Sequence, residues 1–183
     1  VYELYLKDLD GGKRFFTQAD IDQMAPFQNQ LDDQLQNGTF EFFNVSVQLI
    51  DQSLTKTQGW YREILAKPLD FSQNVTLEAD GKKLSWAQND AELRQRWESW
   101  MKYEVLNRIT DEQEKQDKPG FTGEKKSFET LEAESRQKVL DVYDKWFKRL
   151  EKMDRDRRME IYLNAVTNVF DPHTGYFSPK EKE

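Results

Sequence analysis

The residues of this chain that could do chemistry are few, and its only histidine lies near the C-terminal end. His173 follows Asp171 and Pro172. A serine or cysteine nucleophile needs a base to accept its proton, and usually a third group that orients the base. An Asp and a His two residues apart beside a proline are more typical of an Asx-type turn with a partly buried imidazole. We therefore expect a structural role for this pair and no catalytic residue in the chain.

Metal and phosphate sites are not indicated either. The chain has no cysteine, and a structural zinc site needs clustered Cys and His ligands. Residues 8–12 (DLDGG) resemble the start of a calcium loop, but Gly12 and Lys13 occupy the positions that need an oxygen ligand and a glycine. The glycine pair also lacks the spacing of a phosphate-binding loop. We expect no metal and no cofactor, and a turn between two short elements at residues 8–12.

Composition and charge indicate a folded domain with an acidic surface. The 183 residues carry a net charge of -7 and include five Trp, seven Tyr and twelve Phe. So many aromatic side chains provide large apolar surfaces for a core, which disordered chains lack. Nucleic acids and anionic membranes call for a basic face. We expect neither nucleic acid as a partner nor a transmembrane segment, because no apolar run reaches the length that spans a bilayer.

Apolar residues recur at three- and four-residue steps over most of the chain, which predicts an all-α, irregular multi-helix domain. Thr17 and Asp20 resemble a capping box that begins a helix, with a kink or restart at Pro26 and an end at Gly38. Further helices are predicted over 40–67, 89–109, 128–153 and 154–170. In the predicted helix over residues 89–109, the apolar stripe is Leu93, Trp97, Met101, Val105 and Ile109.

Two segments do not fit helical periodicity. In residues 71–88, apolar and polar residues alternate on both sides of Asp80-Gly81, which predicts a short hairpin or an extended segment. Residues 110–126 are polar and charged around Lys118-Pro119-Gly120 and are predicted to form an exposed loop.

Three stretches of the chain carry a resemblance to a known family. Residues 6–21 (LKDLDGGKRFFTQADI) look like the opening of the tail-specific proteases, also called carboxyl-terminal processing proteases. Residues 168–179 (NVFDPHTGYFSP) resemble the segment that leads into the PDZ domain of the same family, and residues 102–107 are similar to its middle region. The family-matching motif at the C-terminal end consists of Asp171, Pro172, His173, Thr174, Tyr176 and Phe177.

The resemblance implies that residues 1–170 are the helical N-terminal domain of a tail-specific protease. Residues 171–183 would then be the junction toward a PDZ domain that this chain does not contain. The implied parent is a periplasmic or envelope serine endopeptidase of a Gram-negative bacterium, with a Ser-Lys dyad beyond Glu183. Its expected partners are its own PDZ and protease domains, protein substrates with apolar C-terminal tails, and an adaptor protein.

Three functions follow as hypotheses from this reading. The first is a non-catalytic domain that shapes substrate access, docks an adaptor or holds the PDZ domain in position. The second is a stand-alone α-helical interaction module. The third is an enzyme that uses a pair of carboxylates, although no spacing in the sequence singles out such a pair.

Overall fold

The structure is a computed structural model that describes residues 1–171 and 173–176. Within these residues the chain is all-α, as predicted, and contains no β-strand. Its elements are α1 (Tyr2–Asp10), α2 (Gln18–Met24), the 3₁₀ helix η1 (Ala25–Phe27), α3 (Leu31–Asn37), α4 (Glu41–Leu65), α5 (Asp90–Gln116), α6 (Phe128–Glu151) and α7 (Arg155–Phe170). No helix in the described part of the chain is long and apolar enough to cross a bilayer.

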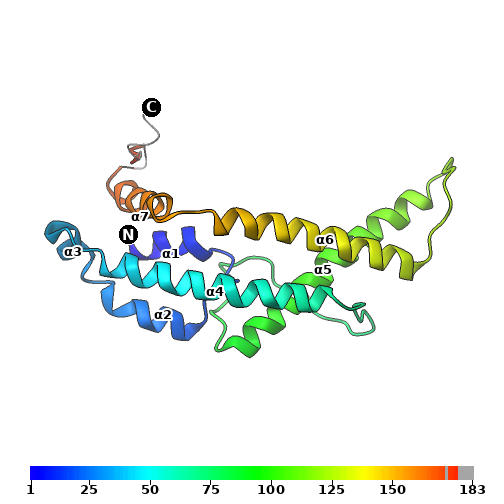
Figure 1. Ribbon diagram of the computed structural model, residues 1–183, viewed down its shortest axis with the longest axis horizontal. Helices are drawn as coiled ribbons and strands as arrows, with labels where there is room; N and C mark the ends of the chain where they lie inside the picture. Colours follow the sequence, from blue (N-terminus) through cyan, green and yellow to red (C-terminus); the bar gives the residue numbers. More distant parts are fainter. Residues whose placement is uncertain (172, 177–183) are drawn as a thin grey trace.

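The helices form an elongated molecule with two ends of different character. Figure 1 shows the three long helices α4, α5 and α6 side by side through the middle, with α5 and α6 extending to one end. The shorter helices α1, α2, α3 and α7 gather at the other end around the start of α4. Helix α5 packs against both α4 and α6, and α1 packs against α7. The long helices therefore build an arm, and the short helices build its base.

Side-chain caps begin the helices where the sequence predicted them. The Asn89 side chain accepts a hydrogen bond from the backbone N–H of Glu92 at 3.0 Å, and Asp154 accepts one from Arg157 at 2.9 Å. At Thr17, the Asp20 carboxylate accepts hydrogen bonds from both the backbone N–H and the hydroxyl, each at 2.8 Å. These contacts satisfy N–H groups that have no partner inside the helix.

The predicted helix over residues 17–38 restarts rather than kinks. Pro26 lies in η1, which follows α2 directly, and α3 begins at Leu31. Gly38 ends α3 with a φ of 68°, the left-handed conformation that glycine adopts without strain. In contrast, α4 runs without a break through Gly59.

The loop that was predicted at residues 110–126 begins later in the structure, after residue 116. Helix α5 continues to Gln116. Its last turns, after Ile109, carry several charged residues and no apolar stripe. Ion pairs join Glu104 to Arg108 and Glu112 to Lys115 along the same helix. Such pairs each stabilise a helix by about 0.2–0.5 kcal/mol. The Glu112–Lys115 pair lies within the extra length and contributes to it, and hydrophobic periodicity does not detect such a pair.

Of the two alternatives for residues 71–88, the extended segment is observed and the hairpin is not. The turn at Asp80-Gly81 does form, with the backbone N–H of Lys83 donating to the carbonyl of Asp80 at 2.9 Å. Its two flanks do not pair, because the second flank is held elsewhere. Trp86 contacts Phe16, and Ala87 forms an isolated parallel bridge with Thr17.

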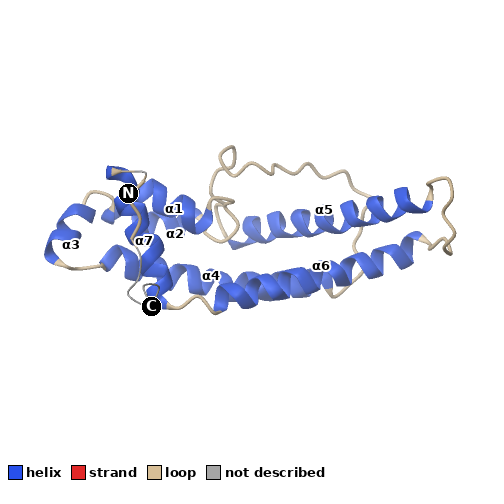
Figure 2. Ribbon diagram, turned by 90° about the horizontal axis from the view of Figure 1, so that it is seen from above, coloured by secondary structure: helices blue, strands red, loops and turns tan. Residues whose placement is uncertain are grey.

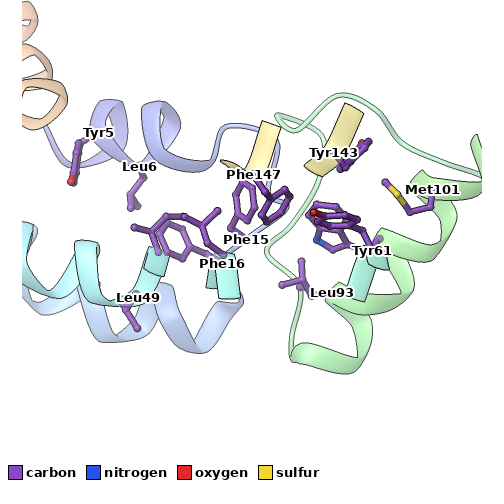
Figure 3. Packing of buried hydrophobic residues seen from close by; sticks show 14 of the residues in the cluster. Tyr5, Leu6, Phe15, Phe16, Leu49, Tyr61, Leu93, Met101, Tyr143 and Phe147 are labelled. Carbon is purple, nitrogen blue, oxygen red and sulfur yellow. The ribbon is translucent and has the colours of Figure 1, made fainter. Parts of the chain in front are cut away.

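Aromatic side chains hold the arm to its base. Phe15, which follows α1, contacts Trp97 of α5 and Phe147 of α6. Trp97 in turn contacts Tyr61 of α4 and Tyr143 of α6. We call these five residues the central aromatic cluster, of which Figure 3 shows Phe15, Tyr61, Tyr143 and Phe147. Its ring centroids are 4.8–6.4 Å apart, the range in which tilted and edge-on aromatic pairs attract each other. All five residues are buried, so this cluster fixes the position of residues 11–16 against the arm.

Candidate functional site: the turn at residues 11–14 and its cavity

The turn at residues 11–14, which we call the N-terminal turn, is organised by the buried carboxylate of Asp10. One oxygen of this carboxylate accepts a hydrogen bond from the backbone N–H of Arg14 at 2.7 Å. The other accepts from Phe15 at 2.8 Å and from Phe16 at 2.9 Å. Asp10 is only 4% exposed. A single side chain therefore satisfies three backbone donors and directs two phenylalanines into the core.

Burial also changes the acidity of Asp10. Desolvation raises the pKa of its carboxyl to about 6, against the opposing effect of its three backbone donors. Asp171 provides a contrast, since it also accepts a backbone hydrogen bond but is exposed. There the N–H of His173 and the hydroxyl of Thr174 lower the pKa of the carboxyl. The pKa is thus raised at the buried Asp10 and lowered at the exposed Asp171, so burial has a larger effect on the pKa of Asp10 than its hydrogen-bond donors have.

We predict that the Asp10 carboxyl titrates near pH 6 in the folded domain, while the Asp171 carboxyl titrates below its ordinary 3.8. Carbon-13 NMR of the side-chain carboxyl groups, followed between pH 2 and 8, measures both midpoints. The exposed Asp171 serves as the internal control. A midpoint for Asp10 at or below 4 would contradict the dominance of burial.

Three contacts hold the N-terminal turn from outside. The indole N–H of Trp97 donates to the carbonyl of Arg14 at 2.7 Å. The Lys13 ammonium donates to the carbonyl of Leu84. Gly81 lies against the backbone of Gly11 so closely that a Cβ at Gly81 would overlap the Gly11 carbonyl oxygen. The turn is thus fixed between α5 and the extended segment.

Replacing Gly81 with alanine should lower the free energy of unfolding by about 1–3 kcal/mol, because two backbones must separate to admit the methyl group. Gly59→Ala is the matched control. A Cβ at Gly59 meets nothing within 4 Å, and alanine is favoured in a helix interior, so this change should stabilise by about 0.5–1 kcal/mol. Urea unfolding of both variants measures the difference. Equal effects of the two substitutions would argue against the close approach.

A cavity of about 340 Å³ lies between the N-terminal turn, residues 75–79 and the first turns of α5. Its apolar walls include Val75, Leu77, Trp97 and Trp100. The guanidinium of Arg14 lies 3.8 Å from the ring centroid of Trp100, a cation–π contact on the cavity wall. The volume lies within the range of ligand pockets, although near its lower limit.

The charged groups at the cavity differ in how they are paired. Arg96 forms an ion pair with Glu92 at 2.6 Å and also donates to the carbonyl of Ser85 at 2.8 Å. Lys13 is held by the Leu84 carbonyl. Among the described residues, the guanidinium of Arg14 makes neither a hydrogen bond nor an ion pair. The cavity therefore presents an aromatic wall and an immobilised cation with free donors, an arrangement suited to binding an anionic group.

The C-terminal motif forms a turn on α7, away from this cavity. Asp171 accepts hydrogen bonds from the backbone N–H of His173 and the hydroxyl of Thr174, both at 2.9 Å. The expected Asx-type turn is therefore present, but the expectation of a partly buried imidazole is wrong, since His173 is exposed. Tyr176 folds back on α7, where its N–H donates to Asn164 at 2.7 Å. Pro172 and Phe177 lie outside the described residues.

Residues 1–180 match the sequence profile of the family described as "Tail specific protease N-terminal domain". The chain belongs to this family. It is also similar to the "Tail-specific protease" of Haemophilus influenzae (strain ATCC 51907 / DSM 11121 / KW20 / Rd), with 26% identity over 186 aligned residues. That alignment covers 98% of this chain but 24% of the relative, so the chain spans about a quarter of the relative's length.

Membership of the tail-specific protease N-terminal domain family confirms the resemblance seen in residues 6–21 and 168–179. The structure adds a physical role for the first of these stretches, because it contains Asp10 and the whole N-terminal turn. A turn was predicted at residues 8–12, but residues 8–10 belong to α1 and the turn begins at Gly11. The cavity had no comparable signal, because its walls come from three separate parts of the chain. Within the described residues, no group of three or more His, Cys, Asp or Glu could hold a metal ion.

Proposed function

We propose that this domain is the non-catalytic scaffold and substrate-access domain of a periplasmic serine endopeptidase. The endopeptidase would process or degrade proteins from their C-terminal tails. The observation that carries this proposal is the alignment, which covers nearly all of this chain and about a quarter of a tail-specific protease. The other three quarters of such a protease are where we place the Ser-Lys dyad, together with a PDZ domain.

The end of α7 supports a role in holding a neighbouring domain. Phe170 is 84% exposed and Val169 is 52% exposed, and they adjoin each other at the last turn of this helix. An exposed apolar pair of this kind stabilises an interface when it becomes covered. The turn at Asp171 and the return of Tyr176 onto Asn164 hold residues 173–176 close to the same helix end. We propose that residues 171–183 lead into the PDZ domain and that this pair packs against it.

The proposal is tested in the full-length protease by comparing two kinds of substrate. A version that lacks residues 1–170 should cleave short unstructured peptides at rates near those of the intact enzyme. Its choice and turnover of folded proteins with apolar C-terminal tails should change. Unchanged turnover and selectivity on such proteins would overturn the access role, and loss of peptide cleavage would assign this domain a part in the chemistry.

A point variant keeps the test valid if the truncated enzyme does not fold. Replacing both Val169 and Phe170 with serine in the full-length enzyme removes the exposed pair and leaves the core of the domain intact. The matched control is Val142→Ser, which changes a residue on α6 of similar exposure, 48%. We expect only the double variant to alter protein turnover. The rival hypothesis, a free-standing interaction module, predicts no effect of either change on proteolysis.

A further inference from the structure

Residues 75–79 form one wall of the cavity and have unpaired backbone groups. The extended segment runs alongside α5 (Figure 2), and none of the five residues makes a backbone hydrogen bond to any described part of the chain. Val75 and Leu77 alternate with Thr76 and Glu78, as in a β-strand, and Val75 is 50% exposed. A row of free N–H and C=O groups of this kind can pair with an added strand.

The N-terminal turn, which also lines the cavity, carries the Arg14 cation, whose guanidinium has no hydrogen-bond or ion-pair partner among the described residues. Arg14 is held in place at both its backbone and its side chain, by Asp10, Trp97 and Trp100. Its guanidinium retains its hydrogen-bond donors and has a planar shape that fits a carboxylate. Trp97, Trp100, Leu77 and Leu84 supply apolar surface beside it. Residues 75–79, with their unpaired backbone groups, and the guanidinium of Arg14 therefore belong to the lining of one cavity with apolar walls.

We propose that this cavity binds an internal segment of an extended, acidic polypeptide by adding a strand to residues 75–79. An apolar side chain of the bound segment enters the cavity, and a neighbouring Asp or Glu side chain pairs with the guanidinium of Arg14. The inference deepens the access role proposed above, because it gives the domain a place to hold an unfolded part of a substrate.

The features of the cavity favour a polypeptide over other ligands. The backbone row needs a partner with alternating donors and acceptors at the spacing of a strand, which another polypeptide supplies. An internal segment can pair along the whole row, whereas a chain end would leave part of it unpaired. The apolar walls select an apolar side chain, and Arg14 selects an acidic neighbour.

The test uses the 183-residue chain and a short end-blocked peptide in which valine and threonine alternate around a central aspartate–leucine pair. Fluorescence polarisation of a dye-labelled peptide measures the affinity, and amide NMR shows whether residues 75–79 become protected from exchange. Arg14→Gln should weaken binding at least about tenfold, through the loss of a charge-assisted hydrogen bond. Arg94→Gln is the matched control on α5, because Arg94 pairs with Glu63 outside the cavity and should not affect binding.

Chemical variants of the peptide test the mode of binding. The peptide nitrogens are methylated one at a time. Methylation should abolish binding only at every second position, because alternate N–H groups of a strand face the neighbouring strand. Replacing the aspartate with lysine should weaken binding as strongly as Arg14→Gln does.

Four results would overturn the proposal. They are no binding by the end-blocked peptide, binding only by peptides with a free C-terminal carboxylate, equal affinity of Arg14→Gln and the parent, and a methylation pattern without alternation. Because the measurement uses this chain alone, a negative result would leave the proteolysis test of the access role unaffected. Conversely, peptide binding together with unchanged proteolysis would refute the access role and retain the binding site.

Discussion

Replacing Trp97 with alanine is expected to lower the free energy of unfolding by about 3–5 kcal/mol, the range for a large aromatic residue in a core. Trp97 is 2% exposed, and its ring contacts the other four members of the central aromatic cluster. The substitution also leaves the carbonyl of Arg14 without the indole donor. Since marginal stability is usual for a domain, the variant should be largely unfolded at modest urea concentrations.

Two further variants separate the contributions of Trp97. Trp97→Phe keeps most of the ring packing but removes the indole N–H, so it should cost less than the alanine change. Trp60→Ala is the size-matched control, because Trp60 is half-buried on α4 outside the central aromatic cluster. We expect Trp60→Ala to lower the free energy of unfolding by less than half as much as Trp97→Ala does. Urea unfolding followed by circular dichroism measures all three, and equal losses at the two tryptophans would contradict the role of the cluster.

The burial of Trp97 was predictable, because its helix repeats apolar residues with regular spacing. Leu93, Trp97, Met101, Val105 and Ile109 were predicted as one stripe, and each is at most 2% exposed. Helix starts were predictable for the same local reason, since a capping side chain lies within three residues of the N–H that it binds. Local periodicity and local hydrogen bonds are properties that a sequence displays directly.

Contacts between distant segments were not predictable in this way. The hairpin alternative at residues 71–88 rested on local alternation, but the flank that contains Trp86 pairs with Phe16 and Thr17 instead. The packing of Gly81 on Gly11 joins residues 70 positions apart and has no sequence signal. The cavity depends on both contacts, because they bring the extended segment to the N-terminal turn. The site was therefore hidden for the same reason that the sequence could not decide between the hairpin and the extended segment.

Asp10→Ala is expected to cost at least about 3 kcal/mol, because three backbone N–H groups lose their acceptor in a buried turn. Asp10→Asn keeps one acceptor oxygen and should lower the free energy of unfolding at pH 7 by less than Asp10→Ala does. The exposed Asp8, on the same helix, provides the control Asp8→Ala, which should change the free energy of unfolding by no more than about 0.5 kcal/mol. Urea unfolding at pH 7 measures these differences, and similar values for Asp8→Ala and Asp10→Ala would contradict the role of the carboxylate.

The pH dependence of these variants gives an independent test of the same residue. Because the pKa of Asp10 is raised from 3.8 to about 6, the folded domain binds more protons than the unfolded chain between these two values. The stabilisation that comes from this raised pKa is thus complete below pH 4 and is lost as the pH rises through 6, by about 3 kcal/mol, while the three backbone hydrogen bonds remain. Asp10→Asn lacks this titration, so the advantage of the parent over the Asn variant should shrink from pH 4 to pH 7. An advantage that grew over this interval would mean that the ionised carboxylate is the favoured form, with its three donors outweighing burial.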